Sequence, residues 1–266
     1  LFTLEAIAEA LPGQLPALYG ETLARPLQAA CRRAYLRWGM TQGIACSAQD
    51  SGEGALHLSP ALRQLRAPGN TCLSAVRAGA KGTPAHLIND SKGCGAVMRT
   101  APLGLIEGIS PQLAMALGDA AGALTHGHLD GWLPGGALSA MVCLIAQGQA
   151  LRPAAEHTLR LLAEHPHPER GAVMASGTVH QLQIALTLLD EAAPDRATIF
   201  RRLGEGWTGD EALAIGVYAA CAAGSFEDAI RLAANHDGDS DSTASIAGQL
   251  YGARHGLMAL PHAWVR

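Results

Sequence analysis

An acidic segment near the C-terminus holds the residues of this 266-residue chain that are best suited to chemistry. Residues 236–243 read His-Asp-Gly-Asp-Ser-Asp-Ser-Thr, so three carboxylates, those of Asp237, Asp239 and Asp241, lie among hydroxyl groups. Like charges this close repel one another unless a cation or the solvent screens them. All the donors are oxygens, which suits a hard cation such as Mg²⁺, Mn²⁺ or Ca²⁺. We therefore predict a metal site in this segment.

The acidic segment could also belong to an EF-hand or serve as a helix cap. The spacing is similar to the start of an EF-hand, but the loop fails that template, because Ser242 stands where glycine is needed and Gly248 where glutamate is needed. Helix capping is possible because Asp and Ser at a helix start accept backbone N–H bonds and interact well with the helix dipole. A single cap accounts for two of these residues and leaves the rest of the acidic and hydroxyl groups without a role.

A glycine-rich segment, Asn-Asp-Ser-Lys-Gly-Cys-Gly-Ala-Val-Met-Arg over residues 89–99, is the second feature with chemical potential. Small residues before a predicted helix leave backbone N–H groups uncovered, and such groups can hold a phosphate or a ribose. A simple tight turn is the alternative, and a thiolate nucleophile at Cys94 is another, because a helix start lowers a thiol pKa. The segment lacks the Gly-Lys-Ser/Thr ending of a phosphate-binding P-loop.

Several shorter motifs allow both a binding role and a structural one. Residues 125–128, Thr-His-Gly-His, could place His126 against a ligand or end a helix, and they lack further metal ligands nearby. Gly69 and Asn70 begin a turn that either lines a site or caps a helix. We expect a solvated turn at His165 and His167, which alternate with prolines, and a packing role for Trp207.

Apolar residues recur at helical spacing along almost the whole chain, and no strand-like alternation stands out. The pattern predicts helices over residues 1–11, 26–38, 72–78, 95–107, 111–125, 135–149, 153–164, 179–189, 195–203, 210–223, 226–235 and 242–258. It predicts loops over residues 41–59 and 79–91, which are rich in Gly, Ser and other turn formers. We predict an all-α fold in which residues 1–266 form a single compact multi-helix domain.

The composition excludes several classes of protein. Hydrophobic residues make up 48% of the chain and charged residues 16%, which argues against disorder. The net charge of −4 argues against a nucleic-acid partner. Six scattered cysteines without a CxxC pair favour reduced thiols. No apolar run reaches the roughly 18 residues of a membrane span, and the first residues lack the basic start of a signal peptide. We expect a cytoplasmic protein without a membrane partner.

Several motifs together resemble those of the ADP-ribosylglycohydrolase family. Residues 91–105, SKGCGAVMRTAPLGL, resemble its element G-x-G-A-x-M-R-x-x-P, and residues 238–256, GDSDSTASIAGQLYGARHG, resemble its second metal motif. The segments GNTC, THGH and GWTGDEALAIGVYAA are also similar to family elements, in the same order, so the resemblance spans nearly the whole chain. The motifs are more similar to those of a bacterial branch, which includes immunity proteins against ADP-ribosylating toxins, than to those of dinitrogenase reductase-activating glycohydrolase.

The resemblance implies an all-α fold with two divalent ions, Mg²⁺ or Mn²⁺, in a cleft. It implies hydrolysis of the N- or O-glycosidic bond between ADP-ribose and a protein side chain. Asp239, Asp241 and Ser242 match the metal ligands, with Asp239 and Asp241 also catalytic. The residues expected to bind the ADP-ribose part are Gly69, Asn70, Ser91, Lys92, Gly93, Cys94, Gly95, Met98 and His126.

One family element is missing from this sequence. The first metal motif, T-D-D-T, does not occur, and LFTLEAIAEAL at the start resembles the residues that follow it. The C-terminal segment that ends at Arg266 also stops earlier than the family pattern. We expect either that both ends are trimmed, with the motif upstream of Leu1, or that the protein is a metal-poor variant. The resemblance favours a hydrolase of ADP-ribosyl-arginine proteins that releases ADP-ribose. The alternatives are a non-catalytic binder of ADP-ribose or of a cognate ADP-ribosyltransferase toxin, and a structural helical protein with a Ca²⁺ loop.

Overall fold

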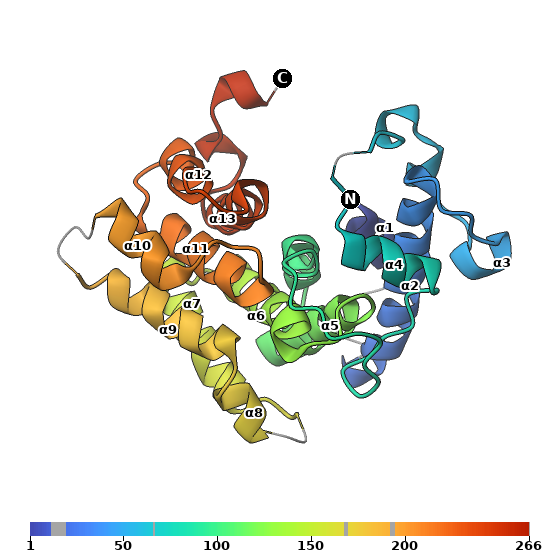
Figure 1. Cartoon of the computed structure of the whole chain (residues 1–266), viewed down its shortest axis with the longest axis horizontal. Coiled ribbons are helices and arrows are strands. Elements are labelled where there is room, and N and C mark those ends of the chain that lie inside the picture. Colours follow the sequence, from blue (N-terminus) through green and yellow to red (C-terminus); the bar gives the residue numbers. More distant parts are fainter. Residues whose placement is uncertain (12–19, 66, 168–169, 192–194, 266) are drawn as a thin grey trace.

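The computed structural model describes residues 1–11, 20–65, 67–167, 170–191 and 195–265 (Figure 1). Within these ranges the chain forms α-helices joined by short 3-10 turns, and the described part contains no β-sheet. The predicted all-α fold is confirmed. The helices are α1 (Phe2–Ala10), α2 (Ala24–Thr41), α3 (Ala48–Ser51), α4 (Asn70–Arg77), α5 (Pro111–Ala123), α6 (Leu129–Ala146), α7 (Leu151–Ala163), α8 (Arg170–Met174), α9 (Gly177–Leu188), α10 (Arg196–Leu203), α11 (Gly209–Ala222), α12 (Phe226–Ala234) and α13 (Ser240–His255).

Helix α6 is the central element of the fold. All its residues from Asp130 to Ile145 are buried. Its neighbour α5 comes very close, since a Cβ on Gly118 would lie 2.5 Å from the Gly135 carbonyl oxygen. Contrary to the expectation that no apolar run is this long, α6 is the one helix of the described part that is long and apolar enough to cross a membrane, by length and composition only, and 89% of it is buried inside the protein. That degree of burial is typical of a core helix.

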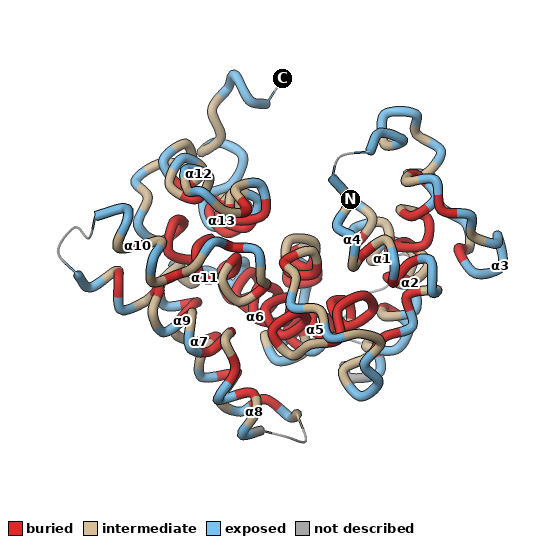
Figure 2. Tube along the Cα trace, in the orientation of Figure 1, coloured by how far each residue is buried: buried red, intermediate tan, exposed pale blue. Residues whose placement is uncertain are grey.

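The core has two main parts that meet at α5 and α6 (Figure 2). One part joins α6 to α7, α9, α11 and α13, and the other joins α1 and α2 to α5. Figure 1 shows α1, α2 and α4 on one side of the molecule and α12 and α13 on the other. Helices from the start of the chain therefore lie opposite helices from its end.

Helix α1 is attached to α2 by a buried arginine. The Arg37 side chain is fully buried and donates hydrogen bonds to the carboxylates of Glu5 (2.8 Å) and Glu9 (2.9 Å) and to the carbonyl of Ser51 (2.6 Å). Glu5 in turn accepts the backbone N–H of Leu56 at 3.0 Å. Because a buried guanidinium is stable only when its donors are satisfied, this network holds α1, α2 and the following loop together.

The prediction of a helix over residues 95–107 is wrong. This segment instead contains two short 3-10 helices, Val97–Arg99 and Ala101–Leu105. Pro102 has no backbone N–H to continue an α-helical ladder. Gly104 lies so close to α6 that a side chain there would overlap the Ser139 carbonyl oxygen. The close packing against α6 therefore sets the path of this segment.

Other boundaries also differ from the predicted ones. Helix α6 begins at Leu129 rather than at Gly135, because the His128 side chain caps it by accepting the N–H of Asp130 at 3.0 Å. Helix α3 lies inside a predicted loop, and α8 was not predicted. Both are four or five residues long, too short to show a helical repeat in the sequence.

The expectation of a solvated turn at His165 is wrong. His165 is buried, and its Nε2 donates to the carboxylate of Asp119 on α5 at 2.8 Å, while its Nδ1 accepts the N–H of His167. Burial raises the pKa of Asp119 to about 6, although the hydrogen bond from His165 acts in the opposite direction. The hydrogen bond between His165 and Asp119 therefore anchors this loop on α5.

Candidate active site

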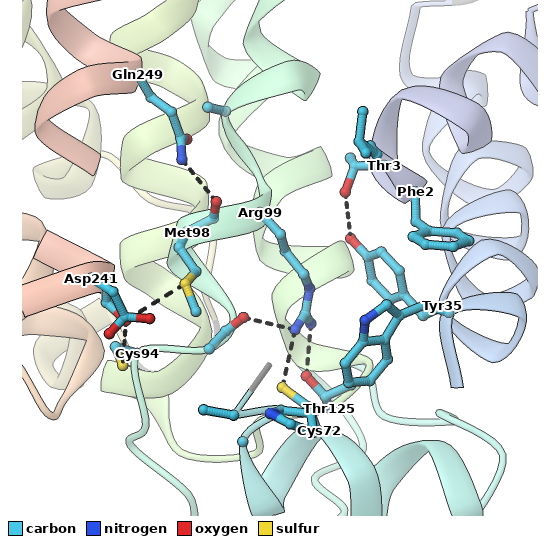
Figure 3. Close-up of a pocket in the computed structure, with 18 of the residues that line it drawn as sticks. Phe2, Thr3, Tyr35, Cys72, Cys94, Met98, Arg99, Thr125, Asp241 and Gln249 are labelled. Carbon is cyan, nitrogen blue, oxygen red and sulfur yellow. Dashed lines mark hydrogen bonds between the residues drawn. The ribbon is translucent and has the colours of Figure 1, made fainter. Parts of the chain in front are cut away.

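A cavity of about 1320 Å³ lies between the two groups of helices (Figure 3). Residues of α1, α2 and α4 line one side of it, and residues of α12 and α13 line the other. Ten of the residues predicted to form the site line this cavity: Gly69, Asn70, Gly93, Cys94, Gly95, Met98, His126, Asp239, Asp241 and Ser242. The structure thus brings together motifs from four separate parts of the sequence.

The other two predicted residues, Ser91 and Lys92, do not line the cavity. Ser91 Oγ lies 2.9 Å from Thr71 Oγ1 and accepts the N–H of Gly93, so it supports the turn from behind. Lys92 is half-exposed, and its ammonium group lies 3.9 Å from Asp130. Its backbone carbonyl accepts the N–H of Gly209 at 2.8 Å. Ser91 and the backbone of Lys92 thus help to fix the glycine turn, and a contact of either residue with a ligand stays a prediction.

The glycine turn does not have the structure predicted for it, in which free N–H groups at the start of a helix would hold a phosphate or a ribose. It leads into a three-residue 3-10 helix, so no α-helix dipole points at the cavity here. Two of its N–H groups are already bonded, that of Gly93 to Ser91 Oγ (3.3 Å) and that of Cys94 to the carbonyl of Trp207 (3.2 Å). The prediction of a helix start at this turn is therefore wrong, although the turn does form part of the cavity wall.

The acidic segment supplies both a helix cap and two cavity carboxylates. Asp239 is the N-cap of α13, and its carboxylate accepts the N–H of Ser242 at 3.4 Å and the thiol proton of Cys94 at 2.8 Å. Asp239 is buried in the wall, whereas Asp241 is exposed. Asp237 is exposed and does not line the cavity. Asp239 thus both caps α13 and lines the cavity, and two of the three carboxylates, those of Asp239 and Asp241, face the cavity.

The pKa values of the two cavity carboxylates are shifted in opposite directions. Burial raises the pKa of Asp239, but hydrogen bonds from Asp241, Cys94 and Ser242 outweigh it and bring the pKa below its ordinary value. The hydrogen bond with Asp239, together with burial, raises the pKa of Asp241. The two carboxylates therefore titrate as an interacting pair, in which Asp239 loses its proton before Asp241.

Cys94 remains a neutral thiol. Burial, and secondarily the hydrogen bond to Asp239, raises its pKa to about 12. A thiolate nucleophile needs a lowered pKa and a cationic partner. Cys94 meets neither requirement, because its pKa is raised and its thiol donates a hydrogen bond to an anionic carboxylate.

His126 and Arg99 form the floor of the cavity next to the glycine turn. His126 is buried, and burial, followed by the positive charge of Arg99, lowers its pKa to about 3, so its ring is neutral. Arg99 donates to the carbonyl of Gly95 (2.9 Å) and to Thr125 Oγ1 (2.7 Å), and it lies 4.5 Å from the ring centre of Tyr35. The sequence interpretation missed Arg99, yet a charged residue within the apolar run 96–106 was a usable signal.

Aromatic residues of the cavity were also missed or assigned to the core. Tyr35 and Trp38 of α2 line the cavity together with Phe2 and Phe226. Trp207, expected to be a packing anchor, is 56% exposed and lines the cavity mouth. Apolar spacing along a helix cannot distinguish a face turned to the core from a face turned to a cavity.

The donors present fit one side of a hard cation. Asp239, Asp241 and Ser242 offer only oxygens, and two neighbouring carboxylates make a positive charge favourable between them. Across the described ranges, no three His, Cys, Asp or Glu side chains form a group that could hold a metal ion. The predicted pair of ions would therefore need ligands beyond those that the described residues supply.

The comparison with known families agrees with the motifs seen in the sequence. The model of the ADP-ribosylglycohydrolase family matches the chain over residues 1–266. A search of curated proteins finds no significant match. Since the match covers all the elements that surround the cavity, the chain belongs to the ADP-ribosylglycohydrolase family.

Proposed function

We propose that this protein is a divalent-metal-dependent hydrolase that removes ADP-ribose from modified protein side chains, with arginine as the linkage. The observation that carries the proposal is the pair Asp239 and Asp241 in the wall of a cavity that also contains the glycine turn. Family membership supports ADP-ribosyl hydrolase activity in general. The metal requirement and the arginine linkage are proposals that follow from the oxygen donors and from the motif resemblance.

The cavity suits an extended ligand. Its volume of about 1320 Å³ exceeds the roughly 300–1,000 Å³ of most small-molecule sites. In Figure 3, Asp241 and Cys94 lie on one side, and Phe2 and Tyr35 lie on the other. A ligand with a sugar at one end and a planar base at the other, such as ADP-ribose, matches this division between polar and aromatic walls.

The chain's own residues have distinct parts in the proposed reaction. A divalent ion bound at Asp239, Asp241 and Ser242 would orient ribose hydroxyls and make a water more acidic. Asp239 is buried and braced by Cys94, so it maintains the geometry of the acidic turn. Asp241 is exposed, so its carboxylate can accept a proton from the water that attacks the anomeric carbon. The bond from the water oxygen to the anomeric carbon replaces the glycosidic bond, the proton taken up by Asp241 passes to the leaving side-chain nitrogen, and the products are ADP-ribose and the free side chain.

Release of ADP-ribose from an ADP-ribosyl-arginine protein, measured by chromatography with Mg²⁺ or Mn²⁺ present, tests the proposal. We expect Asp239→Ala and Asp241→Asn to lower the rate by at least about 100-fold, and EDTA to abolish it. Asp237→Asn is the matched control, because Asp237 belongs to the same segment and does not line the cavity. Unchanged turnover in Asp239→Ala would overturn the role of the acidic pair. An ADP-ribosyl-serine substrate tests the linkage.

A second function is favoured by one observation, the small number of acidic groups at the site. Only Asp239 and Asp241 of the described acidic residues line the cavity. A non-catalytic protein that binds ADP-ribose, an ADP-ribosylated target or a transferase toxin would need no further acidic residues in the cavity. Titration with free ADP-ribose alongside the release assay separates the two functions, because a binder saturates without forming product.

A further inference from the structure

We propose that Arg99, acting through Thr125, positions His126 as a neutral donor whose Nε2–H faces the ligand in the cavity. Arg99 and Thr125 are positioning residues in this scheme, and His126 is the residue that contacts the ligand. The identity of that ligand as ADP-ribose rests on the proposed function. The arrangement of the three side chains rests on the geometry alone.

A continuous chain of hydrogen bonds links the three residues. The guanidinium of Arg99 donates from Nη2 to Thr125 Oγ1 across 2.7 Å. The same Oγ1 lies 2.7 Å from His126 Nδ1. Since a guanidinium can only donate, Thr125 must accept from Arg99, and its single hydroxyl proton remains available for another acceptor.

Only one acceptor suits that proton. The carbonyl oxygen of Gly122 is the alternative, but it lies 3.5 Å from Thr125 Oγ1, which is long for an O–H···O bond. That oxygen already accepts the backbone N–H groups of Thr125 and His126, both at 3.2 Å. The hydroxyl proton therefore goes to His126 Nδ1. A neutral imidazole that accepts at Nδ1 carries its own proton on Nε2.

The Nε2 edge of His126 faces the glycine turn of the cavity wall. A Cβ added to Gly93 would lie 3.3 Å from Nε2, and one added to Gly95 would lie 3.4 Å from Cε1. The two glycines therefore keep this edge uncovered. The N–H groups of Gly93 and Cys94 are bonded within the protein, so the Nε2–H of His126 is a donor that this part of the wall still offers. A neutral N–H suits a ribose hydroxyl or a pyrophosphate oxygen.

Arg99 is held in place by the protein itself. Its Nη1 donates to the carbonyl of Gly95, its Nη2 donates also to the carbonyl of Ala121 at 3.2 Å, and its guanidinium stacks on Tyr35. Contacts to three elements leave little freedom for the side chain to turn toward a ligand. Both terminal nitrogens of Arg99 are therefore engaged, while its buried Nε has no hydrogen-bond partner in the described residues. The guanidinium reaches His126 through Thr125.

The tautomer of His126 can be read directly by long-range ¹H–¹⁵N NMR of the whole protein. We expect wild-type protein and Thr125→Ser to show a protonated Nε2 and an unprotonated Nδ1. Thr125→Val, which keeps the shape and removes the hydroxyl, should show a mixture of tautomers. A wild-type signal with the proton on Nδ1, or an identical signal in folded Thr125→Val, would overturn the proposal.

Calorimetric binding of free ADP-ribose gives a second, independent readout. Thr125→Val and His126→Asn should bind about 5- to 10-fold more weakly, while Thr125→Ser should stay within about 2-fold of wild type. His126→Gln should recover part of the loss, because its amide nitrogen reaches toward the position of Nε2, and it also serves if Thr125→Val does not fold. Equal affinity of the Gln and Asn variants would overturn the inference. Failure of wild-type protein to bind ADP-ribose would instead contradict the proposed function, and the NMR result would still decide the arrangement.

Discussion

The thiol of Cys94 donates a hydrogen bond to the carboxylate of Asp239 across 2.8 Å, although the two residues are 145 positions apart in the sequence. This contact joins the glycine turn to the acidic turn at the start of α13. It shields Asp239 within the cavity wall and leaves Asp241 as the more exposed carboxylate. The two motifs that carry the family resemblance thus meet at a single hydrogen bond.

Alkylation of Cys94 should be slow in the native protein. Its pKa, raised from 9.0 to about 12 by burial and by Asp239, lowers the thiolate fraction by about 1,000-fold at pH 8. We expect iodoacetamide to modify Cys94 at least about 100-fold more slowly in native than in urea-unfolded protein, measured by peptide mass spectrometry. Cys46, which is less buried, is the internal control. Similar native rates at Cys94 and Cys46 would contradict the buried hydrogen-bonded thiol.

The stability of the protein should carry a pH dependence from Asp119. Its pKa is about 6 in the folded protein against an ordinary value of 3.8, because burial disfavours the charged form. The folded state therefore binds this proton more tightly, and the contribution of Asp119, present in full below about pH 4, is lost as the pH rises through about 6. The difference corresponds to about 3 kcal/mol. His165 partly offsets the penalty through its hydrogen bond.

Urea unfolding of wild-type protein and of Asp119→Asn between about pH 4 and pH 8 tests this dependence. We expect the wild-type free energy of unfolding, relative to that of Asp119→Asn, to fall between about pH 4 and 6 and then to level off. Asp195→Asn is the control, since this exposed helix cap has a pKa below its ordinary value of 3.8, so its contribution changes only below about pH 4 and the relative stability should stay nearly level over the measured range. A relative stability that rises over this range would contradict the raised pKa of Asp119.

Removal of the Arg37 guanidinium should destabilise the protein strongly. Arg37→Met leaves Glu5 and Glu9 facing a buried apolar group, and we expect a loss of about 3 kcal/mol in the free energy of unfolding. The matched control is Arg33→Met on the same helix, because the Arg33–Glu9 pair is near the surface and should be worth less than about 1 kcal/mol. Equal losses in the two variants would show that burial of Arg37 is unimportant. Since Phe2 and Thr3 of α1 line the cavity, Arg37→Met should also weaken ADP-ribose binding.

A methyl group at Gly238 should disturb the acidic turn. A Cβ there would overlap the carbonyl oxygen of Glu205, the same oxygen that accepts the N–H of Asp239 at 2.8 Å. We expect Gly238→Ala to lower the melting temperature and the affinity for Mn²⁺ and ADP-ribose together, because the clash displaces Asp239. Gly224→Ala is the control, since nothing lies within 4 Å of its added Cβ. If thermal melting and calorimetry show no difference between the two variants, the close contact of Gly238 with Glu205 is not needed.

Most helices could be predicted from the sequence because their apolar residues repeat every three to four positions. The exceptions have specific causes. The segment containing Pro102 and Gly104 follows the surface of α6, and α6 itself begins early because the His128 side chain caps it. His165, next to Pro166, was predicted to lie in a solvated turn, but its partner Asp119 is distant in sequence. In each case a tertiary contact outweighed the local pattern.

By itself, the sequence determined the helical class, the order of the motifs and the residue types that suit a hydrolase of this family, because periodicity, capping and motif spacing act between neighbours in the chain. Only the tertiary structure decided which of those residues share a cavity. In the tertiary structure the ammonium group of Lys92 lies near Asp130, and the thiol of Cys94 donates a hydrogen bond to Asp239. Arg99 donates a hydrogen bond to Thr125, which lies next to His126. These relationships depend on packing between segments that are far apart in the sequence, and such packing leaves no local pattern by which it could be predicted.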